Sequence, residues 1–167
     1  IVLMDARSSL PIFVLILIVL VALSAYFSAS ETAFASYNKM RMKSEAEDKK
    51  AIKARRVLSL SENYEKLIST ILIGNNIVNI VATSVATLLF THLISNEAVA
   101  ATVSTVVMTL AVLTFGEITP KTVAKRTADS FTKKVADSLS VLTIVFTPLT
   151  FIFNLWQKFV LKFFKDD

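Results

Sequence analysis

The sequence predicts an all-helical membrane protein, and three observations support this class. Hydrophobic residues make up 54% of the 167 residues and the mean hydropathy is +0.62, which is too apolar for an ordinary soluble domain of this size. Its apolar runs are far longer than normal strands and show no alternation of period two. The chain has no cysteine, so the sequence offers neither disulfides nor thiolate metal ligands.

We expect the first membrane helix over about residues 10–37. Pro11 stands at its start, where a residue without a backbone N–H is tolerated, and the apolar run that follows can cross most of a hydrocarbon core of roughly 30 Å. This run is longer than the apolar part of a signal peptide and leads into a polar motif instead of a cleavage site. Within it Ser24, Ser28 and Glu31 share one face, although either hydroxyl could instead bond a carbonyl of its own helix.

Residues 38–66 predict a charged helical hairpin on the cytoplasmic side. They hold nine Lys or Arg residues against five Asp or Glu residues, and short basic loops stay in the cytoplasm. We therefore expect a multi-pass protein of the plasma membrane with its N-terminus outside and its C-terminus in the cytoplasm. The same rule accounts for the net charge of +5, and because the basic clusters lack interleaved aromatic residues, we do not expect nucleic-acid binding.

The second and third membrane helices are expected over about residues 67–93 and 98–120. A short connection without Lys or Arg joins them, which suits the outer side of the membrane. Asn75 and Asn79 lie on one face of the second helix, with Asn76 beside them. Unpaired amides are costly in a bilayer, so these side chains must face protein, water or an ion. The simplest alternative is that they tie helices together by hydrogen bonds.

Residues 121–165 are expected to form a juxtamembrane belt bent at Pro148. Basic residues flank the apolar segment 139–156 at both ends, and a fourth crossing would leave Lys158 and the lysines after it outside, against the positive-inside rule. A re-entrant or interfacial helix keeps both ends in the cytoplasm, and Trp156 suits the interface. We therefore favour three spans and a belt helix over four spans.

The third membrane helix ends in a motif that contains Gly116, Glu117, Pro120 and Lys121. Pro120 has no N–H, so in an α-helix the carbonyl four residues earlier, that of Gly116, loses its donor. This carbonyl lies beside the carboxylate of Glu117, which suggests a site for a hard cation. The alternative is a simple ion pair between Glu117 and Lys121, one helical turn later. Gly116 and Pro120 also predict a hinge, because irregular backbone at membrane depth normally lines a cavity.

Polar groups recur in each expected span, and all of the candidate ligand atoms are oxygens. Sites made only of oxygen suit Mg²⁺, Ca²⁺ or Na⁺, whereas transition metals usually recruit His or Cys. The sole histidine, His92, lies at the expected outer end of the second helix. Because ionisable residues inside a membrane are functional by default, we predict one cation site at which the three helices converge.

Three stretches together resemble the signature motifs of the CNNM/CorC transmembrane domain: FSASETA at 27–33, ILIGNNIVN at 71–79 and FGEITPK at 115–121. The resemblance covers nearly the whole chain. It implies a set of metal ligands that consists of Ser28, Asn75, Asn79, Gly116 and Glu117, with Glu31, Asn76 and Lys121 as further residues of the ion path. Ala29 and Thr119 depart mildly from the family pattern, and neither departure removes an implied ligand.

The resemblance also implies a homodimeric transporter that exports Mg²⁺ in exchange for Na⁺, with three spans, a belt helix and an acidic intracellular cavity. Cytoplasmic CBS domains that bind nucleotide belong to this family, so we interpret residues 1–167 as the single transmembrane domain of a longer protein. The alternative function is a membrane-anchored ion sensor or accessory subunit that binds a divalent cation without transporting it. We do not expect an enzyme, because the sequence lacks an intramembrane histidine and the HExxH and GxSxG motifs.

Overall fold

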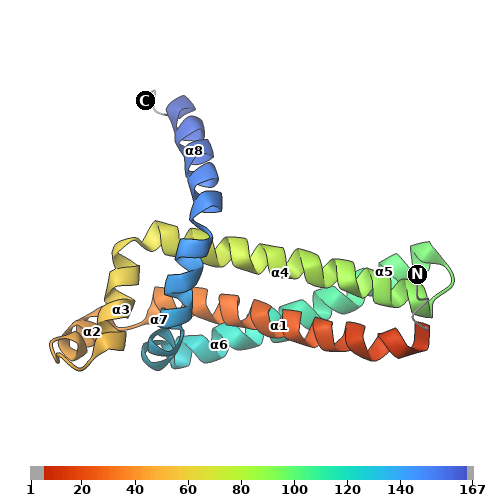
Figure 1. The fold of residues 1–167 in the computed structure, drawn as a ribbon, viewed down its shortest axis with the longest axis horizontal. Helices are drawn as coiled ribbons and strands as arrows, with labels where there is room; N and C mark the ends of the chain where they lie inside the picture. The colour runs from red at the N-terminus through yellow and green to blue at the C-terminus, as the bar shows by residue number, and fades with distance from the viewer. Residues whose placement is uncertain (1–5, 165–167) are drawn as a thin grey trace.

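The computed structural model describes residues 6–164, with side chains from residue 9 onward. Within this range all regular structure is helical (Figure 1). The elements are α1 (Ala6–Ser36), α2 (Lys39–Ala46), α3 (Ile52–Glu62), α4 (Tyr64–Leu93), α5 (Glu97–Ala111), the π-helix η1 (Val112–Ile118), α6 (Thr119–Arg126), α7 (Ala128–Val145) and α8 (Thr147–Phe163). The last residue of the predicted belt, Lys165, lies outside the described residues.

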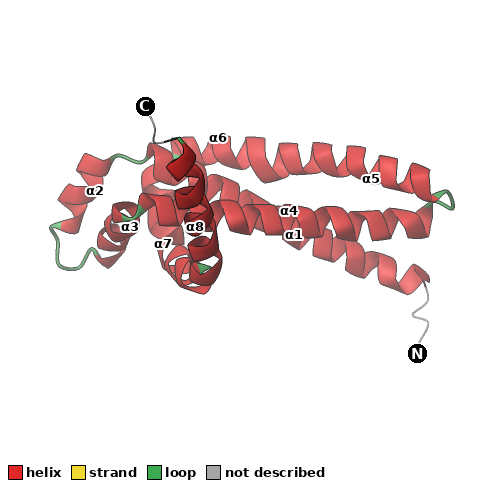
Figure 2. Ribbon diagram, turned by 90° about the horizontal axis from the view of Figure 1, so that it is seen from above, coloured by secondary structure: helices red, strands yellow, loops and turns green. Residues whose placement is uncertain are grey.

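Three long helical rods run side by side along the molecule: α1, α4, and a third rod in which α5, η1 and α6 follow one another (Figure 1; Figure 2). The stretches Ser9–Ser36, Tyr64–Leu93 and Glu97–Arg126 are each long and apolar enough to cross a membrane. The predicted all-helical class with three candidate spans is thereby confirmed for residues 6–164.

Asparagine caps mark two of the turns between the helices. Asn38 accepts a hydrogen bond from the N–H of Arg41 and begins α2, while Asn96 accepts one from the N–H of Val99 and begins α5. Asn is among the preferred N-cap residues because its side chain satisfies a free N–H of the first turn. The short turn before α5 makes α4 and α5 antiparallel neighbours (Figure 1).

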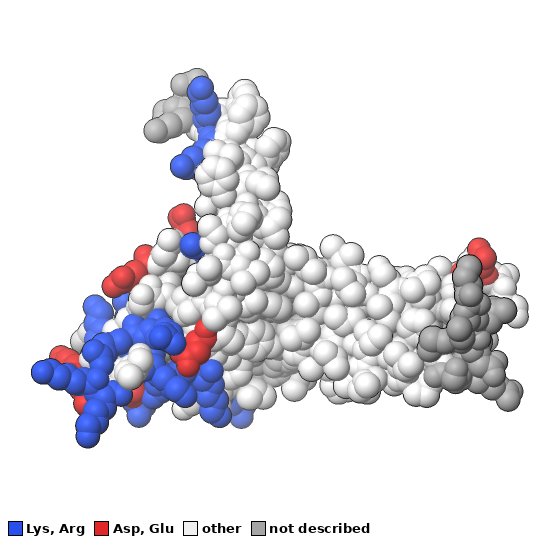
Figure 3. Space-filling model, viewed as in Figure 1, with Lys and Arg blue, Asp and Glu red and all other residues white. Residues whose placement is uncertain are grey.

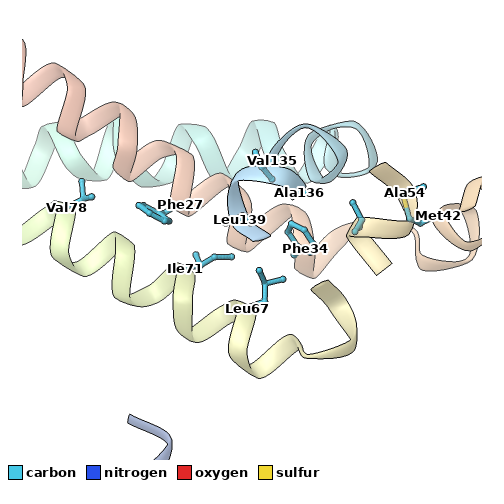
Figure 4. Close-up of a cluster of buried hydrophobic side chains, with 11 residues drawn as sticks. Phe27, Phe34, Met42, Ala54, Leu67, Ile71, Val78, Val135, Ala136 and Leu139 are labelled. Carbon is cyan, nitrogen blue, oxygen red and sulfur yellow. The ribbon is translucent and has the colours of Figure 1, made fainter. Parts of the chain in front are cut away.

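The helix α1 is the central element of the bundle, and it packs against α4, η1, α6 and α7. Its Phe27 and Phe34 enter a buried apolar cluster together with Leu67 and Ile71 of α4 and Leu139 of α7 (Figure 4). Residues of the hairpin helices α2 and α3 complete the same cluster. One core therefore joins two of the spans, α1 and α4, with the hairpin and α7.

Helix α7 crosses the rods near this end, and α8 leaves it at a bend of 68°. The break at Phe146 lies two residues before Pro148, a residue that is tolerated in the first turn of a helix. From there α8 projects sideways from the rods (Figure 1), with exposed aromatic side chains such as Phe151, Trp156 and Phe159. Counting the bent pair as one span would give four crossings. The sideways direction of α8 agrees with the belt, which stays a prediction.

Charged side chains gather at the end of the rods that carries α2 and α3 (Figure 3). Salt bridges between α7 and the hairpin lie within this region and hold α7 across the ends of the spans. The pairs are Lys133 with Glu45 at 2.7 Å, Arg41 with Asp129 at 3.7 Å, and Arg56 with Asp137. Because these pairs are partly exposed, each contributes little alone, but together they fix the position of α7.

Replacing Gly74 by alanine is expected to destabilise the packing of α4 against α1. A Cβ atom at position 74 would lie 2.4 Å from the ring of Phe27, and this ring is itself buried. The ring would have to move inside a packed cluster, and overpacking of this kind costs about 1–3 kcal/mol. The measurement is the free energy of unfolding of the purified chain in detergent.

Ser84→Ala on the exposed side of the same helix is the matched control and should leave the stability nearly unchanged. Adding Phe27→Leu to Gly74→Ala should recover part of the loss. If the second exchange recovers nothing, the ring of Phe27 is not the obstacle.

Candidate functional site

Ser24 lies at the point where the three rods meet. Its side chain is buried, and its hydroxyl donates a hydrogen bond to Oδ1 of Asn75 on α4 at 3.1 Å. On its other side lies Gly116 of η1, since a Cβ atom built on that glycine would be 2.9 Å from Ser24 Oγ. The sequence left open that Ser24 bonds a carbonyl of its own helix, but the structure directs it to α4. Ser24 therefore connects α1 to both other rods.

Glycine at position 116 makes this contact between α1 and η1 possible. The atoms nearest to a Cβ atom at this position would be Oγ and Cβ of Ser24, at 2.9 and 3.3 Å, and the short serine side chain has little freedom to withdraw. Small residues at helix interfaces in membranes allow backbones to approach closely. Gly116 thus has a packing role in addition to the carbonyl that the sequence singled out.

The segment around Gly116 is a π-helix, which the sequence did not predict. The N–H of Thr119 bonds the carbonyl of Thr114, five residues earlier. In this register the N–H that Pro120 lacks would have served the carbonyl of Phe115, whereas the α-helical register assigned it to Gly116. In the π register, the carbonyl left without a donor is therefore that of Phe115 instead of that of Gly116. Such segments are rare and occur frequently at functional sites.

Two buried side-chain oxygens in the described part of the chain have no hydrogen-bond partner, Ser28 Oγ on α1 and Asn79 Oδ1 on α4. Native structures satisfy most buried polar atoms, so an unpaired one requires an explanation, such as an ion or a water molecule. Both atoms belong to residues that the motifs marked as ligands. The predicted site thus contains the unsatisfied acceptors that an incoming cation would need.

These two unpaired oxygens lie on opposite sides of the Ser24–Asn75 contact. The helices α1 and α4 are antiparallel (Figure 1), so a step of four residues along each helix leads in opposite directions. Each such step is about 6 Å along the axis. Ser28 is therefore displaced toward the charged end of the bundle and Asn79 away from it. In this conformation the polar groups form a short line along α1 rather than a closed shell around one point.

An ion pair lies at the charged end of this line. Lys121 Nζ on α6 is 3.5 Å from Oε2 of Glu31 on α1, so the alternative pairing of Lys121 with Glu117 is not the one observed. Glu117 is half-buried and has no ion pair among residues 9–164. Asn76 is exposed and donates to the carbonyl of Leu72 in its own helix at 2.8 Å. The structure therefore does not bring Asn76 to the line of polar groups.

The sequence reasoning did not assign Ser24 to the site, although it placed Ser24 on the same helical face as Ser28. The helical face that it shares with Ser28 was the feature of the sequence that could have identified Ser24. On this feature alone, either serine was a candidate for contact with the other helices. Only the packing of α4 and η1 against α1 selects Ser24 as the residue that contacts Asn75 and Gly116.

The chemistry of this region suits a hard cation held by neutral oxygens. Hydroxyl and amide oxygens dominate, and the oxygens of Ser24 and Asn75 keep free lone pairs while they bond each other. Among the described residues no group of three or more His, Cys, Asp or Glu side chains is placed to hold a metal ion. The arrangement can therefore bind a cation through weak oxygen ligands with little compensating charge.

Comparison with known proteins shows that the chain is similar to a family of membrane domains and to several curated proteins. The family model of the cyclin M transmembrane N-terminal domain, CNNM, matches residues 15–166. A UPF0053 protein of Haemophilus influenzae is 38% identical over 161 residues, which cover 95% of this chain and 37% of that protein. A UPF0053 inner membrane protein of Escherichia coli is 34% identical over 140 residues, covering 84% of this chain and 32% of that protein. A chloroplastic DUF21 domain-containing protein of Arabidopsis thaliana is 33% identical over 148 residues, covering 89% and 22%. The chain thus spans roughly a third or less of the length of these relatives.

Alanine at position 24 should destabilise the chain, whereas alanine at position 28 should not. Ser24→Ala removes the partner of a partly buried amide, and hydrogen bonds between membrane helices are worth about 0.6–2 kcal/mol. Ser28→Ala removes a buried hydroxyl that has no partner, which is neutral or stabilising. The measurement is the free energy of unfolding in detergent without divalent cations. Equal losses for both variants would contradict the observed difference in hydrogen bonding.

Proposed function

The chain belongs to the CNNM family of transmembrane domains, and on this premise we propose that it is the membrane part of a secondary transporter that exports Mg²⁺, coupled to the entry of Na⁺. The observation that carries the proposal is the pair of unpaired buried oxygens, Ser28 Oγ and Asn79 Oδ1, on either side of the Ser24–Asn75 contact. At membrane depth an unsatisfied acceptor is costly. A transported cation would satisfy both in turn.

The proposed ligands are oxygens from all three rods. They comprise the side chains of Ser28, Asn75, Asn79 and Glu117, and we add Ser24 because of its contacts with Asn75 and Gly116. The carbonyl of Gly116 is proposed on the family resemblance alone, since in the π register the donor that Pro120 lacks belongs to the carbonyl of Phe115. Mg²⁺ prefers oxygen ligands and gives up water reluctantly, so several preplaced oxygens are needed to offset its dehydration. A single carboxylate among neutral groups would keep the affinity low enough for release.

The hinge for the transport cycle is proposed at Gly116 and Pro120. The π segment η1 is an irregular stretch within a rod at membrane depth, where such backbone normally lines a cavity. Na⁺ would drive the cycle by binding more tightly to one of two arrangements of this rod, since a ligand that binds both equally shifts nothing.

The remaining expectations about assembly are part of the same proposal. The protein would act as a homodimer in the plasma membrane, with α2 and α3 in the cytoplasm because the basic residues gather there (Figure 3). The α8 helix would lie along the cytoplasmic surface as a belt, with its exposed aromatic side chains in the interface. Cytoplasmic CBS domains of the same full-length protein would regulate it.

Transport can be tested directly in liposomes that contain the purified chain. Vesicles loaded with Mg²⁺ should release it faster when a Na⁺ gradient is imposed, and Glu117→Gln should reduce the rate by about tenfold or more, because it removes the proposed charged ligand. A magnesium-sensitive dye outside the vesicles measures the release.

Glu97→Gln is the matched control, because it removes one carboxylate at the start of α5, at the far end of the rod. It should transport at the wild-type rate. Transport that ignores both the Na⁺ gradient and Glu117→Gln would rule out the exchanger. Binding of Mg²⁺ without any release would instead favour the ion sensor.

A further inference from the structure

We propose that Lys121 acts as an internal cation that alternates between Glu31 and Glu117 and so competes with the transported ion for Glu117. In the arrangement described by the structure, Glu31 holds Lys121 and leaves the carboxylate of Glu117 open. When the transported ion leaves, the ammonium group of Lys121 takes its place beside Glu117. This inference rests on the proposed function, since it assigns Glu117 to the ion path.

The first step of the argument is the position of Lys121 between two carboxylates on different helices. Lys121 lies in the first turn of α6, directly after the π segment. Its Nζ atom is 3.5 Å from Oε2 of Glu31, and the side chains of the pair are 41% and 34% exposed. A salt bridge with this much exposure is weak. It can therefore break during a transport cycle at little cost.

The second step concerns the distance of Lys121 from Glu117 along the chain. Glu117 precedes Lys121 by four residues, and residues at this spacing are neighbours on a helix surface, with the order Glu before Lys as the favourable one. The flexible stem of lysine lets the ammonium group swing between partners without movement of the backbone. Both carboxylates are thus within the range of one side chain.

The third step concerns the energetic cost of leaving the carboxylate of Glu117 without a cation. Glu117 is half-buried in a segment long and apolar enough to span a membrane, and it has no ion pair among residues 9–164. A carboxylate without a counter-charge is expensive at such a position. A cation satisfies it while it is bound, and Lys121 is the nearest basic side chain in the sequence that can satisfy it afterwards. Glu31 is then the partner that holds Lys121 away from Glu117 while the ion is bound.

Binding of Mg²⁺ to the purified chain in detergent, measured by calorimetry, tests this competition. Lys121→Gln removes the competitor and should tighten binding by about tenfold, while Glu31→Gln releases Lys121 toward Glu117 and should weaken binding by a similar factor. In liposomes Lys121→Gln should slow the release of Mg²⁺ despite its tighter binding.

The double variant Glu31→Gln with Lys121→Gln separates competition from a general effect of charge. Competition predicts that the double variant binds as tightly as Lys121→Gln alone, because Glu31 matters only through Lys121. Independent charge effects predict a return to the wild-type affinity. Such a return would overturn the inference.

Lys125→Gln is the matched control, since Lys125 lies one turn further along α6 and is exposed. It removes the same charge and should change the affinity by less than about twofold. A wild-type chain that binds Mg²⁺ with an affinity that none of these exchanges alters would defeat the inference but leave the proposed function intact. A wild-type chain that binds no Mg²⁺ would defeat both.

Discussion

The contact of Ser24 with Asn75 and Gly116 is the interaction on which the arrangement of the three rods depends. It sets the positions of α4 and η1 along the axis of α1. Helical geometry then determines where the other polar residues lie relative to this contact. Helices in a membrane gain little from burying apolar surface against one another, so close packing at small residues and hydrogen bonds between side chains decide their register. Gly116 supplies the small residue at this crossing, and Ser24 supplies the hydrogen bond.

The two ends of the bundle are held together in different ways. At the charged end, an apolar cluster and salt bridges from α7 to the hairpin join five helices into one unit. Toward the middle, small side chains and a few polar contacts replace this dense packing. The line of polar groups lies where the two regions meet, since Phe27 and Val78 of the apolar cluster adjoin Ser28 and Asn79 in the chain.

The sequence predicted the features that depend on local composition. Long apolar runs gave the three candidate spans, the basic stretch gave the hairpin, and Pro148 marked the break before α8. It could not predict what depends on contacts between distant segments. Spacing favours a pair of Lys121 with Glu117, one helical turn earlier, and only the packing of α1 against α6 shows that Lys121 pairs with Glu31. The π register likewise differs from the α register by one hydrogen-bond step, which no propensity of Val112–Ile118 specifies.

The π segment also explains a regular spacing in the third rod. Its buried residues Ala100, Ser104, Met108, Gly116 and Ala124 are separated by multiples of four. In an α-helix of about 3.6 residues per turn, positions four apart drift around the axis by about 40° at each step, so this stripe would wind away from its neighbours. The wider turns of η1 rotate less per residue and reverse part of the drift. The segment thereby keeps the buried residues of the rod closer to one stripe, which packs against α4 along α5 and against α1 along η1 and α6.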